Sequence, residues 1–308
     1  MGTSIYFWIG FHVFVFIMLA LDLGVFHKHT HKVPVKEAIL WSCVWIFLAL
    51  LFSLFIYLDN DFGPVKALEF LTGYVIEYSL SVDNIFVFIL IFSYFAVDAR
   101  YQHKILFWGI LGALIMRGIF IFTGVALINR FNWIVIIFGG FLVFTGIRML
   151  FSKETKVDPE KNIVVRFFRK FLPVTKTLHG EKLFITQDRK LHATPLFLVL
   201  MIIESSDLIF AVDSIPAILA ISKDIFIVYT SNIFAILGLR SLYFAIAGIM
   251  GYFRFLKVGL AFVLSFVGLK MLSSYFHFEI PIVTSLGIII SILLISILAS
   301  VFIKKEEG

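Results

Sequence analysis

Apolar stretches of about 20 residues recur along almost the whole chain, and short polar connections separate them. A helix of that length crosses the ~30 Å hydrocarbon core of a bilayer. The pattern therefore predicts an all-α polytopic membrane protein with about nine transmembrane helices. The expected spans cover residues 5–26, 37–58, 65–96, 105–128, 132–150, 194–221, 225–248, 255–274 and 282–303.

The composition agrees with this interpretation, because 61% of the 308 residues are hydrophobic and 15% are charged. A soluble protein of this length carries more charge. The formal net charge of +6 does not indicate a nucleic-acid partner, since Lys and Arg follow the distribution typical of membrane proteins. The single cysteine, Cys43, excludes an internal disulfide and a cysteine-based zinc site.

Basic residues gather in alternate connections, namely 27–36, 98–104, 152–192, 251–257 and the tail after 303. Because cytoplasmic loops carry the excess of Lys and Arg, the N-terminus is expected outside and the C-terminus in the cytoplasm, in a bacterial inner membrane. The first apolar run has no charge before it and three lysines after it, the reverse of a secretory signal. It is therefore interpreted as a retained span. The loop after it contains His27, His29 and His31, for which no metal role is assigned.

The connection 152–192 is the one long polar segment, and it carries ten Lys and Arg residues. Within it, 164–172 has the pattern of a basic amphipathic helix that lies on the inner surface of the membrane, in contact with anionic lipids. A solvated linker is the alternative. Residues 182–192 alternate weakly, which predicts a short hairpin that turns near 187–190.

Carboxylates inside the predicted spans are the main candidates for function. A charge at bilayer depth costs about 3 kcal/mol on insertion scales, so each one needs a physical reason. The usual reason is a binding site or pathway for a cation. Two clusters contain five such residues, Glu77 and Asp83 in the first, and Glu204, Asp207 and Asp213 in the second.

The two clusters belong to an internal repeat. Residues 82–84 align with 212–214, Arg117 aligns with Arg240, and 146–150 align with 268–272. Each copy has three spans, so the second crosses the membrane in the opposite sense, as in many secondary transporters. The predicted organisation is two helices in 1–64, a first repeat in 65–151, a cytoplasmic loop in 152–192, an inverted repeat in 193–275, and a last helix with its tail in 276–308.

Helix geometry decides which acids can meet. Residues six apart on a continuous helix point about 120° apart, so Asp83 and Asp213 join the other acids only if both helices break. Pro216 predicts the second break, and the 32-residue length of span 65–96 leaves room for the first. The predicted metal ligands are then Glu77, Asp83, Asn84, Glu204, Asp207 and Asp213, with Ser214, Asn232, Arg117 and Arg240 as supporting or gating residues.

An all-oxygen ligand set suits hard cations such as Mg²⁺, Ca²⁺ and Mn²⁺. These ions are transported substrates in this interpretation, protons released by the buried acids are the candidate counter-ion, and no resident cofactor is expected. An enzymatic role is not expected either. Paired aspartates on facing helices are used by intramembrane aspartyl proteases, but their Gly-x-Gly-Asp motif is absent from the sequence.

Four segments carry a family resemblance: YSLSVDN, GALIMRGIFIFTG, ATPLFLVLMIIESSDLIFAVDSIPAI and SNIFAILGLRSLYF. Over about 65–275 the chain resembles the TerC family of integral membrane proteins, which includes Alx-type manganese exporters. The resemblance implies a cation exporter that lowers cytoplasmic Mn²⁺, with Glu77, Asp83 and Asn84 in the first acidic motif and Glu204, Asp207 and Asp213 in the second. Two alternatives stay open, a role in membrane-protein assembly and transport of another hard cation such as Ca²⁺.

Overall fold

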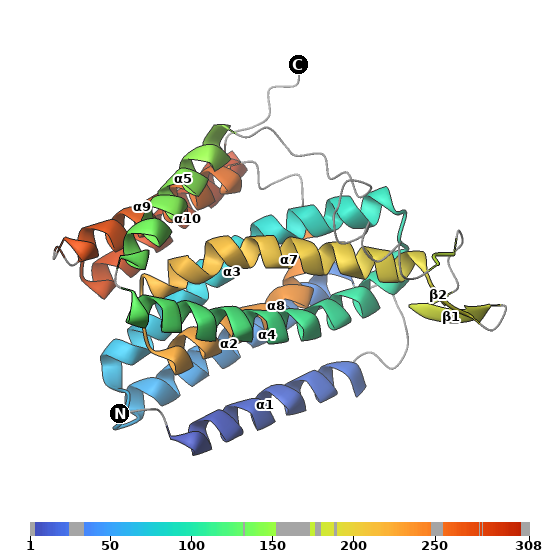
Figure 1. Cartoon of the computed structure of the whole chain (residues 1–308), viewed down its shortest axis with the longest axis horizontal. Helices are drawn as coiled ribbons and strands as arrows, with labels where there is room; N and C mark the ends of the chain where they lie inside the picture. The colour runs from blue at the N-terminus through green and yellow to red at the C-terminus, as the bar shows by residue number, and fades with distance from the viewer. Residues whose placement is uncertain are drawn as a thin grey trace.

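The computed structural model describes residues 4–24, 34–131, 133–151, 173–175, 180–187, 190–247, 255–276, 278 and 280–302. Within these residues the chain forms the nine predicted apolar helices and one hairpin (Figure 1). The elements are α1 (Ile5–Gly24), α2 (Val35–Leu58), α3 (Gly63–Tyr94), α4 (Ala99–Arg130), α5 (Ile134–Phe151), β1 (Phe184–Gln187), β2 (Lys190–Ala193), α7 (Pro195–Leu219), α8 (Ile225–Ala247), α9 (Leu256–Tyr275) and α10 (Ile282–Phe302). Eight of the helices are long and apolar enough to cross a membrane, and α1 contributes a shorter apolar stretch, Ile5–Leu21.

Helices α3, α4, α7 and α8 form the centre of the molecule. Helix α8 contacts α2, α3 and α4, and it is buried along most of its length. Helix α2 covers α3 and α8, and α1 lies along the outside of this group (Figure 1). Many large apolar side chains are exposed, among them Phe16 on α1, Leu50 on α2 and Ile115 on α4. In a bilayer these side chains face lipid, which is as apolar as they are.

The remaining helices, α5, α9 and α10, form a second group beside the centre (Figure 1). Helices α5 and α9 approach very closely through glycines. A Cβ atom added at Gly146 would lie 2.6 Å from the carbonyl oxygen of Ala261, and one added at Gly268 would lie 2.7 Å from that of Gly139. Small residues at such contacts let two backbones meet in lipid.

These contacts repeat in a symmetric manner. The spacing along the chain from Gly139 to Ala261 equals the spacing from Gly146 to Gly268. Gly139 on α5 therefore corresponds to Ala261 on α9, and Gly146 corresponds to Gly268. Each helix uses these two corresponding positions to contact the other. The contacts between α3 and α8 likewise have their counterpart between α7 and α4. A two-fold relation between two three-helix units would produce such a reciprocal pattern, and the inverted repeat itself stays a prediction.

The predicted helix breaks are wrong. Helix α3 is continuous over Gly63–Tyr94, and α7 is continuous over Pro195–Leu219. Pro216 lies in the last turn of α7, where loss of one backbone hydrogen bond disturbs little of the helix. In α3 the hydroxyl of Ser79 donates to the carbonyl of Val75 one turn earlier, which satisfies this polar side chain without opening the helix.

The predicted hairpin is confirmed. Strands β1 and β2 pair antiparallel, with Phe184 opposite Ala193 and Gln187 opposite Lys190. Thr194 then ties the hairpin to the start of α7, because its hydroxyl donates to the carbonyl of Lys182 at 2.7 Å. The amphipathic helix predicted for 164–172 and the loop that contains His27, His29 and His31 lie outside the described residues.

Candidate cation-binding site

Arg117 of α4 is the centre of the buried polar structure. Its side chain is fully buried, although arginine is rarely buried unless it is paired. Nη2 donates to Oδ1 of Asp207 at 2.8 Å, and Nε donates to Oδ2 of the same carboxylate at 3.1 Å. This two-point pairing of the planar guanidinium with a carboxylate is the strongest geometry available to the two groups. It joins α4 of the first predicted repeat to α7 of the second.

The same guanidinium binds a second carboxylate. Nη1 of Arg117 donates to Oε1 of Glu77 on α3, and also to Oδ1 of Asn232 on α8 at 3.2 Å. The amide nitrogen of Asn232 donates in turn to Oε2 of Glu77 at 3.1 Å. Glu77, Arg117, Asp207 and Asn232 form the buried charged cluster, to which each of the four central helices contributes one side chain. Arginine stays protonated in proteins, so with both acids ionised the cluster carries one net negative charge.

Glu204 lies one helical turn before Asp207 on α7, but its environment is different. Its Oε2 is buried and has no hydrogen-bond partner among the described residues. The carboxyl group rests against Gly112 of α4, where there is no room for a Cβ atom. Beside it is a cavity of about 10 Å³ that Glu204 lines together with Asp207 and Arg240, and this volume suits one water-sized occupant.

The other predicted ligands are placed differently. Asp213 is half-buried on α7 and accepts a hydrogen bond from the hydroxyl of Thr145 on α5, at 3.4 Å. Asn84 and Ser214 are buried, and Oγ of Ser214 has no hydrogen-bond partner among the described residues. The backbone of Asp83 is helical, whereas its side chain lies outside the described part of the structure.

The structure thus brings Glu77, Asp207, Arg117 and Asn232 together, with Glu204 beside them, and directs Asp213 toward α5. In the part of the chain that is described, no three His, Cys, Asp or Glu side chains form a group with metal-ligand geometry. The sequence reasoning did not identify Gly112, which seats Glu204. The sequence feature that could have identified it is the pair of small residues Gly109 and Gly112, which lie three apart on one face of α4 and allow another helix to approach closely.

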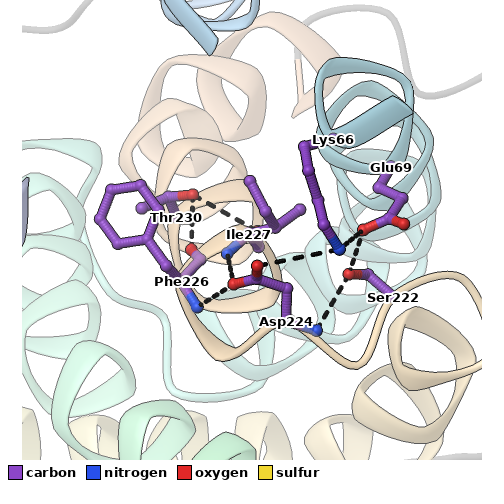
Figure 2. A network of polar contacts seen from close by, with 7 residues as sticks. All are labelled: Lys66, Glu69, Ser222, Asp224, Phe226, Ile227 and Thr230. Atoms are coloured by element: carbon purple, nitrogen blue, oxygen red, sulfur yellow. Dashed lines mark hydrogen bonds and ion pairs between the residues drawn. The ribbon is translucent and has the colours of Figure 1, made fainter. Parts of the chain in front are cut away.

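A second polar network lies where α3 begins and α7 connects to α8 (Figure 2). Lys66 pairs with Glu69 at 2.7 Å and lies 3.8 Å from Asp224, and the hydroxyl of Ser222 donates to Glu69. Asp224 also accepts from the backbone N–H of Phe226 at 3.0 Å, so it caps α8. These ion pairs hold the first turn of α3 to the α7–α8 connection, and we assign them a structural role.

The helices and the buried charged cluster define an integral membrane protein of several apolar helices with ionised groups among its central spans. The chain belongs to the TerC family, since the family description "Integral membrane protein TerC family" matches residues 62–308. The match includes all four members of the buried charged cluster.

Three relatives cover nearly the whole chain. "Uncharacterized membrane protein STKORF319" of Myxococcus xanthus is 50% identical over 97% of this chain and 93% of its own length. "Putative membrane-bound redox modulator Alx" of Escherichia coli strain K12 is 47% identical over 98% of this chain and 97% of its own length. "Uncharacterized membrane protein" of Rickettsia bellii is 41% identical over 97% of this chain and 98% of its own length. No solved structure matches the chain.

Proposed function

We propose that the protein is a secondary transporter that exports a divalent cation, Mn²⁺, from the cytoplasm by alternating access around its buried carboxylates. The observation that carries the proposal is Glu204. A carboxylate oxygen that is buried without a hydrogen bond costs about 1–3 kcal/mol, and a bound cation or proton would supply the missing partner. Because intramembrane acids usually mark ion pathways, we assign this role to Glu204 and to Asp207 beside it.

The chemistry of the cavity supports a hard cation. Glu204 and Asp207 offer oxygen atoms, and the cavity is otherwise lined by Arg240 and apolar residues, with no sulfur or imidazole ligand. Such a set favours Mg²⁺, Ca²⁺ or Mn²⁺, and the resemblance to Alx-type exporters selects Mn²⁺ among them. The relative from Escherichia coli is named for redox modulation. This sequence contains one cysteine, which leaves no pair of thiols within the chain for disulfide exchange, so we place its function in metal transport instead.

The arrangement of the helices supports alternating access. The central helices α3, α4, α7 and α8 hold the buried charged cluster, and α5, α9 and α10 form a separate group beside them. Transporters with inverted repeats move one such group against the other around a site near the midplane. In the proposed orientation the N-terminus is outside, the C-terminus is cytoplasmic, protons released by the acids are the counter-ion, and the basic segment 152–192 contacts anionic lipids.

The test is transport by the purified protein in liposomes that contain a Mn²⁺-sensitive dye. We expect the wild-type protein to carry Mn²⁺ and Glu204→Gln to reduce the flux at least tenfold, because the substitution removes a charge without breaking a hydrogen bond of Oε2. Glu37→Gln, near the start of α2, is the matched control and should transport normally. Absence of wild-type flux, or equal flux in Glu204→Gln, would defeat the proposal. Competition by Ca²⁺ and Mg²⁺ in the same assay decides which cation is preferred.

A further inference from the structure

We propose that the guanidinium of Arg117 is an internal cation that takes the place of the metal in the empty transporter and lets it return across the membrane without a second metal ion. This inference rests on the proposed function. Its basis is the position of Arg117, whose guanidinium already pairs with both Glu77 and Asp207 in the buried core and offsets one of their two charges. A site proposed for cations therefore holds a cation of its own.

Metal and guanidinium exclude each other at these carboxylates. Asp207 uses both of its oxygens for Arg117, and Glu77 uses Oε1 for Arg117 and Oε2 for Asn232. A divalent ion at hydrogen-bond distance from the same oxygens would be repelled by the guanidinium, since charges interact strongly where water is excluded. Metal binding at Asp207 therefore requires Arg117 to release at least part of its pairing.

Asp207 is the residue where the exchange takes place. Its carboxylate binds Arg117 and also lines the cavity beside Glu204. A metal that enters the cavity can use the unpartnered Oε2 of Glu204 first, and it then competes with Arg117 for Asp207. Asn232 keeps its hydrogen bond to Glu77 when the guanidinium moves, so Glu77 keeps a partner during the exchange.

The positive charge of Arg117 matters most when no metal is bound to the transporter. Without a cation, two ionised carboxylates in the membrane interior oppose the passage of the site through the occluded state. The guanidinium of Arg117 is a positive charge that offsets one of the two and moves with the protein. A transporter with this internal cation returns empty and produces net flux. When the acids are ionised, a transporter without it returns only with a bound metal and is limited to metal-for-metal exchange.

The test compares these two modes in liposomes, with Mn²⁺ as the probe. Net efflux is measured into metal-free buffer, and exchange is measured with radioactive Mn²⁺ at equal concentrations on both sides. We expect Arg117→Gln to lose net efflux at least tenfold and to keep exchange within about threefold of wild type. Arg130→Gln, at the exposed end of the same helix, should behave as wild type in both assays.

Several outcomes would overturn the inference. Wild-type net efflux in Arg117→Gln would show that no internal cation is needed, and equal loss of both modes would show that Arg117 only builds the site. If Arg117→Gln does not fold, Arg117→Lys keeps the charge but cannot bridge both acids. It should then slow net efflux more than exchange, and an equal effect would refute the inference. If wild type shows neither mode, the proposed transport function itself is wrong.

Discussion

Asp207 and Asp213 lie six residues apart on the continuous helix α7 and engage different helices. Asp207 pairs with Arg117 of α4, whereas Asp213 accepts a hydrogen bond from Thr145 of α5. The separation follows from helix geometry, because six residues turn the side chain about 120° from the same face. Helix α7 therefore presents one acid to the central helices and another to the neighbouring group. A movement between the two groups would alter the surroundings of Asp213 directly.

This division predicts unequal effects on stability. Asp207→Asn removes the two-point charged pairing with Arg117, which keeps Glu77 as its remaining partner, so we expect the free energy of unfolding to fall by about 1.5–3 kcal/mol. Asp213→Asn keeps an oxygen that can accept from Thr145, so we expect a loss below about 1 kcal/mol. Tryptophan fluorescence during heating in detergent measures both variants. Equal shifts of the unfolding midpoint would show that Arg117 does not depend on Asp207.

The contact between α5 and α9 predicts a sharp difference between neighbouring glycines. Gly146→Ala and Gly268→Ala would each place a Cβ atom against backbone of the other helix, at 2.6 Å and 2.7 Å from carbonyl oxygens. Overpacking of this kind costs about 1–3 kcal/mol. Gly140→Ala on α5 is the matched control, because nothing lies within 4 Å of its added Cβ. It should be neutral, or stabilising through better helix propensity by up to about 1 kcal/mol.

The measurement is the midpoint of thermal unfolding for the three single variants and for the double variant of Gly146 and Gly268. Both sites lie in one interface, so the losses in the double variant should not add. A stable Gly146→Ala variant would mean that the two helices are not packed as closely as described.

Gly112 allows Glu204 to be displaced without changing any charged residue. A Cβ at this position would overlap the carboxyl group of Glu204, which lies at the end of a flexible side chain and can rotate away. We therefore expect Gly112→Ala to fold normally and to weaken Mn²⁺ transport at least fivefold, mainly through a higher KM. Gly118→Ala on the same helix is the control, since its added Cβ would touch the ring of Tyr229 at an ordinary 3.4 Å. Unchanged transport in Gly112→Ala would place the metal away from Glu204.

Much of this fold is visible in the hydrophobic pattern, because a span requires a long apolar run whatever its neighbours are. Eight of the nine helices and the hairpin lie within two residues of their predicted limits, and α4 begins six residues before its predicted start. The continuity of α7 was not predictable from Pro216 alone. A proline kinks a helix in its interior and is tolerated near an end, and the position of the end at Leu219 depends on packing.

The candidate site was predicted in its residue types but not in its pairing. The sequence shows two clusters with five acids in the spans, together with Arg117 and Arg240, which indicates buried charge without revealing which acid meets which arginine. That choice depends on the rotation of each helix about its axis, which is determined by neighbouring side chains. Arg117 therefore pairs with Glu77 and Asp207 from the two predicted repeats, an arrangement that no local pattern contains.

The proposed orientation predicts which connections a membrane-impermeant reagent can reach. Asp61, between α2 and α3, is exposed and should lie outside, whereas Thr186 in β1 is exposed and should face the cytoplasm. With Cys43 replaced by serine, Asp61→Cys should react with an impermeant maleimide in intact cells, and Thr186→Cys should react only after the cells are permeabilised. The Cys43→Ser parent is the control for background labelling. The reverse pattern would invert the orientation, so that the transport direction proposed for the buried carboxylates would have to be reassigned. Three helices, α3, α4 and α5, lie between the two sites, and an odd number of spans places the sites on opposite sides of the membrane. Labelling of both sites from outside would therefore contradict the proposed spans.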